Sequence, residues 1–199
     1  MRLLAARIRT AAWLGWQIES NWADPFLFGV YTVARPVATA LILAGMYWAV
    51  AGQASKAALF ATFYVGNAFH NYVTTVLIGM GWVIVEERED YETLKYVYTS
   101  PIGMFTYLGG RGAVKLVLGT VSLLVTLVVG WVFVGVRWEW ATVAWVPLAV
   151  ALVLGLAACL SFGFLIAGVG LLLPRAAITL NEGVAVALYL VCGVIFPVD

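Results

Sequence analysis

Long apolar runs alternate with short polar segments along the whole chain. Two of these runs, residues 59–85 and 141–173, are much longer than the roughly 9–11 residues of a membrane-spanning strand. Neither run shows the strict alternation of apolar and polar residues that is typical of a barrel strand. Because a backbone in hydrocarbon must satisfy its own hydrogen bonds, these runs predict membrane-spanning helices.

We therefore expect an all-α integral membrane protein with a single transmembrane domain covering residues 1–199. Residues 1–24 mix arginines with tryptophans, which is typical of a helix lying in the membrane interface. About five spans should follow this elbow helix. The expected spans are residues 25–51, 59–85, 113–136, 141–173 and 176–199, with a further short helix outside the bilayer at 86–101.

Composition supports the same class, since 64% of the residues are hydrophobic, 11% are charged and the mean hydropathy is +1.00. The net charge of +1 provides no clustered basic surface, so we expect a lipid bilayer around the chain and no nucleic acid partner. Cys159 and Cys192 lie inside apolar runs without a metal-like or redox-like spacing. They indicate buried packing residues.

Lysine and arginine fall mainly on one side of the predicted spans, and this side is expected to be cytoplasmic. The cations of this side are Arg2, Arg7, Arg9, Arg88, Lys95, Arg111, Lys115 and Arg175, against Lys56 and Arg137 on the other. We expect a multi-pass protein of a prokaryotic plasma membrane, with the N-terminus and segment 86–101 in the cytoplasm.

The segment after the second span is the most charged part of the chain and cannot lie in lipid. Its charged residues are Glu86, Glu87, Arg88, Glu89, Asp90 and Glu92. Tyr91, Leu94 and Tyr98 recur at i, i+3 and i+7, which places them on one face of a short helix. Ser100 and Pro101 should end this helix and supply the N-cap and the first-turn proline of the next. The pattern predicts an exposed amphipathic helix that docks in a groove of a soluble partner.

Two other interpretations of this segment remain open. A plain solvated loop needs no partner, because exposed acids beside a membrane are common. A metal site is disfavoured, since the acids lack the spacing of a calcium loop and no histidine or cysteine lies nearby.

These motifs resemble the membrane subunits of ATP-binding-cassette exporters of the ABC-2 type. Glu87-Arg88-Glu89 matches an acid-rich signature that ends the family's second span, and Thr93-Leu94-Lys95 matches a TLE-like stretch. Ser100-Pro101 matches a Ser-Pro before the third span, and residues 193–199 resemble the end of the fifth. The family usually has glycine where Glu92 stands and an acid where Lys95 stands. The family also has a sixth span. We expect that the present chain is truncated before that span.

The resemblance implies a permease subunit of an ATP-driven exporter that works as a homodimer or heterodimer with two cytoplasmic ABC ATPase subunits. Segment 86–101 would be the coupling helix, and cargo would pass at the dimer interface. No GxxxxGK[ST] sequence occurs in the chain, so we expect no catalytic residue, metal or cofactor here, with ATP and Mg on the partner ATPase. A drug or lipid-like cargo is weakly favoured by the apolar interior.

Polar residues in the second predicted span form a candidate pathway lining. Asn67, Asn71 and Thr74 share a helical face, and His70 shares a face with Thr74 at i, i+4. The alternative is that these groups hydrogen-bond between helices, which contributes about 0.6 kcal/mol each. The sequence gives both interpretations equal support.

Two further charged residues lie inside predicted spans. Glu182 follows Arg175 by seven residues, so an ion pair with Arg175 is favoured over a place in the pathway. Arg35 could reach the cytoplasmic interface, pair with a carboxylate or bind lipid headgroups.

Other function classes make different predictions. A channel, secondary carrier or structural bundle would have no ATPase partner and would tolerate changes on the face formed by Tyr91, Leu94 and Tyr98. An intramembrane enzyme would need a nucleophile, base or metal-ligand set, which His70 alone does not provide.

Overall fold

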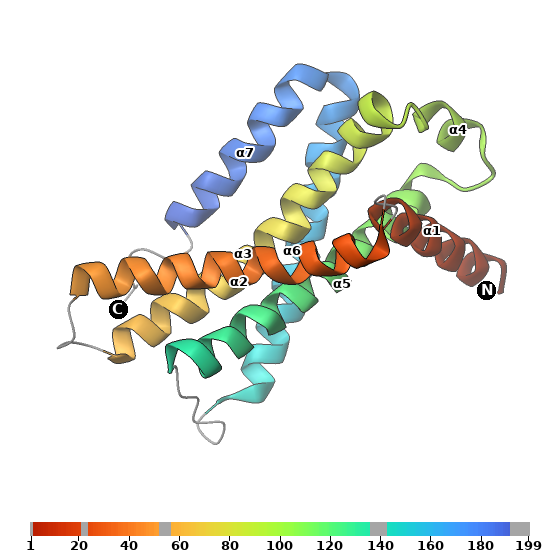
Figure 1. Ribbon diagram of the computed structural model, residues 1–199. Coiled ribbons are helices and arrows are strands. Elements are labelled where there is room, and N and C mark those ends of the chain that lie inside the picture. The colour runs from red at the N-terminus through yellow and green to blue at the C-terminus, as the bar shows by residue number, and fades with distance from the viewer. Residues whose placement is uncertain (1, 21–23, 52–56, 136–142, 192–199) are drawn as a thin grey trace.

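The computed structural model describes residues 2–20, 24–51, 57–135 and 143–191, and these residues form helices without a β-strand. The expected all-α membrane class is therefore confirmed (Figure 1). The long helices are α1 (Arg2–Ser20), α2 (Pro25–Ala51), α3 (Ala57–Val85), α5 (Met104–Val129), α6 (Trp145–Leu172) and α7 (Pro174–Val191). Shorter elements are the π-helical turns η2 (Glu86–Asp90) and η3 (Gly130–Val134), and α4 (Leu94–Thr99).

Four segments within the described residues are long and apolar enough to cross a membrane. They are Phe26–Met46, Phe60–Glu89, Met104–Phe133 and Trp145–Leu172. Helix α7 is not among them, because its 18 residues include Asn181 and Glu182 as well as Arg175. The fifth span was expected to continue to residue 199, and residues 192–199 lie outside the described part of the chain.

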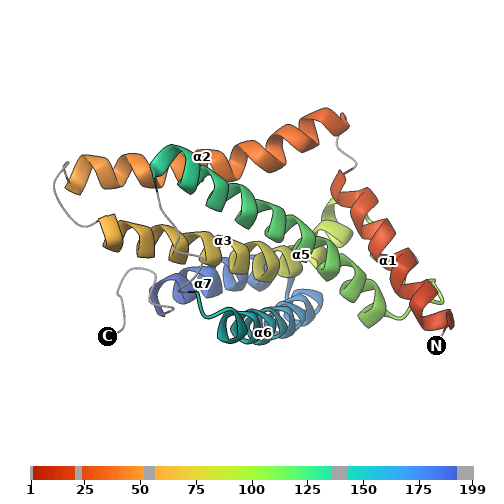
Figure 2. The same ribbon diagram turned by 90° about the horizontal axis from the view of Figure 1, so that it is seen from below.

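Helix α3 occupies the centre of the bundle and contacts α5, α6 and α7 (Figures 1 and 2). Two apolar clusters hold it there. The first cluster lies at the end of the bundle that is far from α1. There α2, α3 and α5 meet through Ala40, Ala44, Phe60, Tyr64 and Val129. The second cluster lies at the end of the bundle that is near α1. There α3, α5 and α6 meet through Met80, Val83, Ile84, Leu108 and Ala167. In Figure 2, α2 lies close to α5 at the first of these ends and diverges from it toward α1.

Helix α1 lies across the first turns of α5. These turns precede the expected start of the third span. We expected the third span to begin at residue 113, whereas α5 begins at Met104. Gly110, in the part of α5 before residue 113, is buried against α1. A Cβ there would lie 2.6 Å from the Ala11 carbonyl carbon. The glycine therefore serves close helix packing.

Helix α7 is fixed to α3 by a buried amide. The Asn181 side chain is buried, and its Nδ2 donates a hydrogen bond of 3.1 Å to the Ile78 carbonyl. A Cβ on Gly81 would lie 2.5 Å from Asn181 Oδ1, so α3 has glycine where α7 approaches. This contact is a structural role that the sequence pattern did not indicate.

We predict that Gly81→Ala lowers the thermal stability of the protein, because the added methyl displaces Asn181. Overpacking of this kind costs roughly 1–3 kcal/mol. Gly66→Ala is the matched control on α3, since nothing lies within 4 Å of its Cβ position. Thermal unfolding of the two variants in detergent tests this contact, and equal midpoints would contradict it.

Candidate functional site

The segment expected to form one coupling helix, Glu86 to Ser100, is two helical pieces in the structure. The π-helical turn η2 continues α3, and the Tyr91 N–H donates to the Glu86 carbonyl at 2.9 Å. Glu92 then adopts a φ of +50°, and α4 begins at Leu94. A residue in the left-handed region cannot continue a right-handed helix, so the chain turns here. The acids therefore belong to the end of α3 and not to α4.

Glu87 is completely buried, which corrects its expected place on an exposed docking helix. The hydroxyl of Thr93 donates to Glu87 Oε2, and the hydroxyl of Tyr107 donates to Glu87 Oε1. Arg111 Nε lies 3.7 Å from the same Oε1. The π-helical turn offsets the helical phase by one residue, which turns this carboxylate toward α5.

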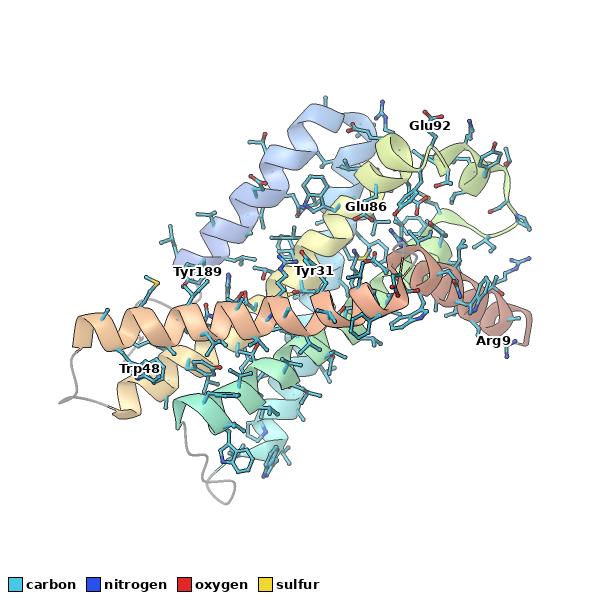
Figure 3. All side chains as sticks on the ribbon, in the orientation of Figure 1. Arg9, Tyr31, Trp48, Glu86, Glu92 and Tyr189 are labelled. Carbon is cyan, nitrogen blue, oxygen red and sulfur yellow. The ribbon has the colours of Figure 1, made fainter. Side chains whose placement is uncertain are left out.

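Arg111 joins the acids of η2 to helix α1. Its guanidinium is buried, with Nη2 at 2.7 Å from Glu86 Oε2 and Nη1 at 3.3 Å from Glu19 Oε1. Nη1 also donates to the Gly15 carbonyl at 3.4 Å. Lys115 Nζ, one turn further along α5, lies 2.6 Å from Glu19 Oε1 and 4.0 Å from Glu86 Oε1. Figure 3 shows Glu86 at the end of α3, beside α1.

We call Glu19, Glu86, Glu87, Arg111 and Lys115 the charge network. It ties α1, η2 and α5 together through side chains that are largely shielded from solvent. Three carboxylates face two cations, so the network carries one carboxylate in excess. A buried network of this kind is worth little as net stability but is costly to break, because each lost partner leaves a buried charge.

The exposed part of the segment is aromatic, and it differs from the predicted face. Tyr96, Tyr98 and Phe105 are 65%, 61% and 83% exposed. Leu94 instead packs against the buried cluster around Met80, which corrects its expected place on the docking face. Tyr91 is half exposed but precedes α4 and does not share its face.

We call Arg88, Glu89, Tyr96, Tyr98 and Phe105 the docking surface. All five side chains are exposed, and they lie on η2, α4 and the start of α5. Aromatic and arginine side chains are enriched where proteins bind one another. Their exposure at the end of α3, on α4 and at the start of α5 is suited to contact with another protein.

Ser100 and Pro101 end α4 and do not start α5. Ser100 is the C-cap of α4, and its hydroxyl donates to the Val97 carbonyl at 2.9 Å. The same oxygen accepts the Ile102 N–H at 3.3 Å, which forms a local turn. Gly103 caps α5. The expected N-cap role of Ser100 is therefore wrong, because its side chain bonds within the turn.

The polar residues expected to line a pathway fall into two groups. Asn71 and Thr74 line a cavity of about 440 Å³ between α2, α3, α5 and the end of α1. His70 instead faces α7, where its ring packs edge-on against Tyr189 at 4.6 Å between centroids. Asn67 does not line this cavity.

The Thr74 hydroxyl bonds to carbonyls of its own helix, at 3.1 Å from His70 O and 3.0 Å from Asn71 O. Glu182 is exposed on α7 and does not line the cavity. Its expected partner Arg175 has a side chain outside the described residues. Within the described ranges, no three His, Cys, Asp or Glu residues are arranged to hold a metal ion.

Comparison with known protein families gives a match over residues 8–199 to the model described as "ABC-2 type transporter". The chain belongs to the ABC-2 type transporter family. It is therefore a membrane permease component of an ABC transporter, a transport component and not itself a catalytic one. Searches among curated proteins and among solved structures found no match.

Membership of the ABC-2 family also gives meaning to the turn at Glu92. The family resemblance placed a glycine at this position, and the φ of +50° is a conformation that glycine adopts without steric cost. Glu92 adopts this conformation although it is not a glycine.

The sequence did not indicate that Glu19, Tyr107, Arg111 and Lys115 would join the acids of η2. One signal was present, because Arg111 and Lys115 are spaced i, i+4 before an apolar run and so share a helical face. Two cations on one face, close to an acidic segment, favour an ion-pair network.

Proposed function

We propose that this chain is the permease subunit of an ATP-driven exporter and that separate ABC ATPase subunits dock on the docking surface. The observation that carries this proposal is the exposure of Tyr96 and Tyr98 on the short helix α4, which follows directly after the buried charge network. ATP and Mg²⁺ would be bound by the ATPase, and two permease subunits would enclose the cargo pathway as a homodimer or heterodimer. The docking surface would face the cytoplasm of a prokaryotic cell.

The charge network supports a route for mechanical coupling in this proposal. When two ATPases close on ATP, their movement would press on α4 and η2. Because Arg111 contacts Glu86, Glu87 and Glu19, a movement of η2 would be transmitted to α1 and the start of α5. The push would then reach the spans as a rigid-body movement of packed helices.

The docking surface can be tested with an ABC ATPase encoded next to the permease gene. We expect Tyr96→Asp combined with Tyr98→Asp to abolish co-purification of the ATPase and transport-coupled ATP hydrolysis. Aromatic residues at the centre of an interface contribute about 2 kcal/mol or more each, which is about 30-fold in affinity for one residue, so the loss of both should lower affinity several hundred-fold. Neither side chain is buried, so the folded permease should accumulate normally.

The control is Tyr96→Phe combined with Tyr98→Phe, which keeps both rings and should retain the ATPase. If the Asp variant binds the ATPase and couples normally, the docking surface is misassigned. If no ABC ATPase binds the wild-type permease at all, a channel or secondary carrier becomes the better proposal.

A further inference from the structure

Two residues of opposite charge lie at membrane depth without an ion pair in the described part of the chain. Arg35 lies inside the span Phe26–Met46. Glu182 lies on α7, and its neighbour Asn181 bonds to the Ile78 carbonyl of the central helix α3. Both charged side chains are exposed, and no ion pair among the described residues includes either of them. Charged groups at this depth normally pair with one another or face a polar interior.

The carboxylates that share a cavity with Arg35 are already paired. Glu19 and Glu86 line the same cavity as Arg35. Glu19 Oε1 lies 2.6 Å from Lys115 Nζ, and Glu86 Oε2 lies 2.7 Å from Arg111 Nη2. The charge network therefore does not compensate the guanidinium of Arg35.

The two charges lie at comparable distances from one end of the bundle. Helix α2 follows α1, and α7 follows the end of α6 that packs near α1 through Ala167. Arg35 comes ten residues after Pro25, and Glu182 comes eight residues after Pro174. These separations correspond to about 15 Å and about 12 Å along the two helices. Long side chains such as these can bridge the difference in depth.

Each charge shares its helical face with small exposed residues. On α2, the exposed residues at i, i+3, i+7 and i+10 are Arg35, Ala38, Ile42 and Gly45. On α7, the exposed residues at i, i+3, i+4 and i+7 are Thr179, Glu182, Gly183 and Val186. Nothing lies within 4 Å of the Cβ position of Gly45 or Gly183. Small residues on such a face allow a helix of another subunit to approach closely.

Figure 2 shows α2 and α7 on either side of α3. In a dimer with twofold symmetry, a contact between two different residues occurs twice, once in each direction. A twofold axis beside α3 would therefore bring α2 of each subunit against α7 of the other. We propose that two copies of this chain pair through these faces, with Arg35 of each bonded to Glu182 of the partner subunit. This inference rests on the proposed dimeric permease and specifies a homodimer.

A second copy of the chain accounts for both charges together. A lipid phosphate would pair with Arg35 and leave Glu182 without a cation. A soluble ATPase would not reach either residue at membrane depth. A guanidinium and a carboxylate away from water form a strong charge-assisted hydrogen bond, and two such pairs fix the register of the interface.

Charge reversal in two differently tagged copies of the full-length permease tests this pairing. In a homodimer of Arg35→Glu, both pairs become two carboxylates, and in a homodimer of Glu182→Arg, both become two guanidiniums. A mixed dimer of these variants keeps opposite charges in both pairs. Because like charges across an interface are strongly unfavourable, mixed dimers should exceed their statistical share about tenfold or more. Native mass spectrometry of the co-expressed chains measures the three dimers.

The matched control is Arg9→Glu co-expressed with Glu92→Arg, because both residues are exposed outside the spans. These chains should form mixed dimers only in the statistical share. If the Arg35 and Glu182 variants also mix statistically, the ion pair is wrong and the proposed dimer still stands. If the wild-type permease is monomeric in lipid nanodiscs, both the ion pair and the dimer are wrong.

Cysteine cross-linking tests the same contact without reversing a charge. The background carries Cys159→Ser and Cys192→Ser and has no other cysteine. We expect a short bifunctional thiol reagent to join Arg35→Cys of one copy to Glu182→Cys of a differently tagged copy. Arg9→Cys should not be joined to Glu182→Cys. Equal yields for the two combinations would overturn the proposal.

Discussion

Arg111→Met is expected to cause the largest loss of stability of any single substitution in the charge network. Arg111 is the side chain that contacts Glu19, Glu86 and Glu87 together. Methionine fills much of the same volume but leaves Glu87 buried without its cation. Breaking a buried ion pair by removing one partner costs about 3–5 kcal/mol. Thermal unfolding of the full-length permease should therefore show a clearly lower midpoint than wild type.

Two further variants separate the ionic contribution from packing. Arg9→Met removes an exposed arginine from α1 and should leave the midpoint unchanged. Adding Glu86→Gln and Glu87→Gln to Arg111→Met removes two of the stranded charges and should recover part of the stability. A midpoint for Arg111→Met within error of wild type would show that the network does not hold the elements together.

The same variant tests coupling. Arg111→Met should reduce the stimulation of the partner ATPase by the permease more than it reduces ATPase binding, because the docking surface is intact. If Arg111→Met instead reduces binding of the ATPase while the bound ATPase is stimulated normally, the charge network contributes to docking and not to the transmission of movement.

The fold class could be predicted from the sequence because hydrocarbon imposes a strong constraint. A run such as residues 59–85 has no alternative to a helix if its backbone is to be satisfied in lipid. Helix α3 has 29 residues, more than the roughly 20 that a spanning helix needs. The start of α5 at Met104 could not be predicted, because glycines that permit helix packing resemble glycines in loops.

The orientation of segment 86–101 could not be predicted for a different reason. Periodicity shows which residues share a helical face, provided that the helix is continuous. Here the π-helical turn and the φ of +50° at Glu92 shift the phase between Glu87 and Leu94. Tyr91 and Leu94 therefore do not share a face, and Leu94 packs inward while Tyr98 stays exposed.

The sequence does not indicate the charge network, because its members lie far apart along the chain. Arg111 and Lys115 contribute to the cytoplasmic excess of cations, and Glu19 lies in the expected interfacial helix. Each residue has a plausible role where it stands in the sequence. Only the crossing of α1 over α5 brings their side chains to the same place.

Gly110→Ala is the second substitution with a large expected effect, because it acts on that crossing. The new Cβ would lie 2.6 Å from the Ala11 carbonyl carbon and 2.7 Å from the Ala12 nitrogen. Both neighbours are backbone atoms, so relief requires the whole of α1 to move away from α5. Overpacking costs roughly 1–3 kcal/mol, and the displacement would also separate Glu19 from Arg111.

Gly109→Ala is the matched control for this prediction, since nothing lies within 4 Å of its Cβ position. Alanine there should be neutral or stabilising by up to about 1 kcal/mol through its higher helix propensity. Trypsin cleavage after the exposed Arg7 and Arg9 reports the release of α1, because cleavage requires local unfolding of that helix. Gly110→Ala should accelerate cleavage several-fold and Gly109→Ala should not. If the two variants are cleaved at the same rate, α1 is not held on α5 through this glycine, and the charge network would then have to maintain the contact alone.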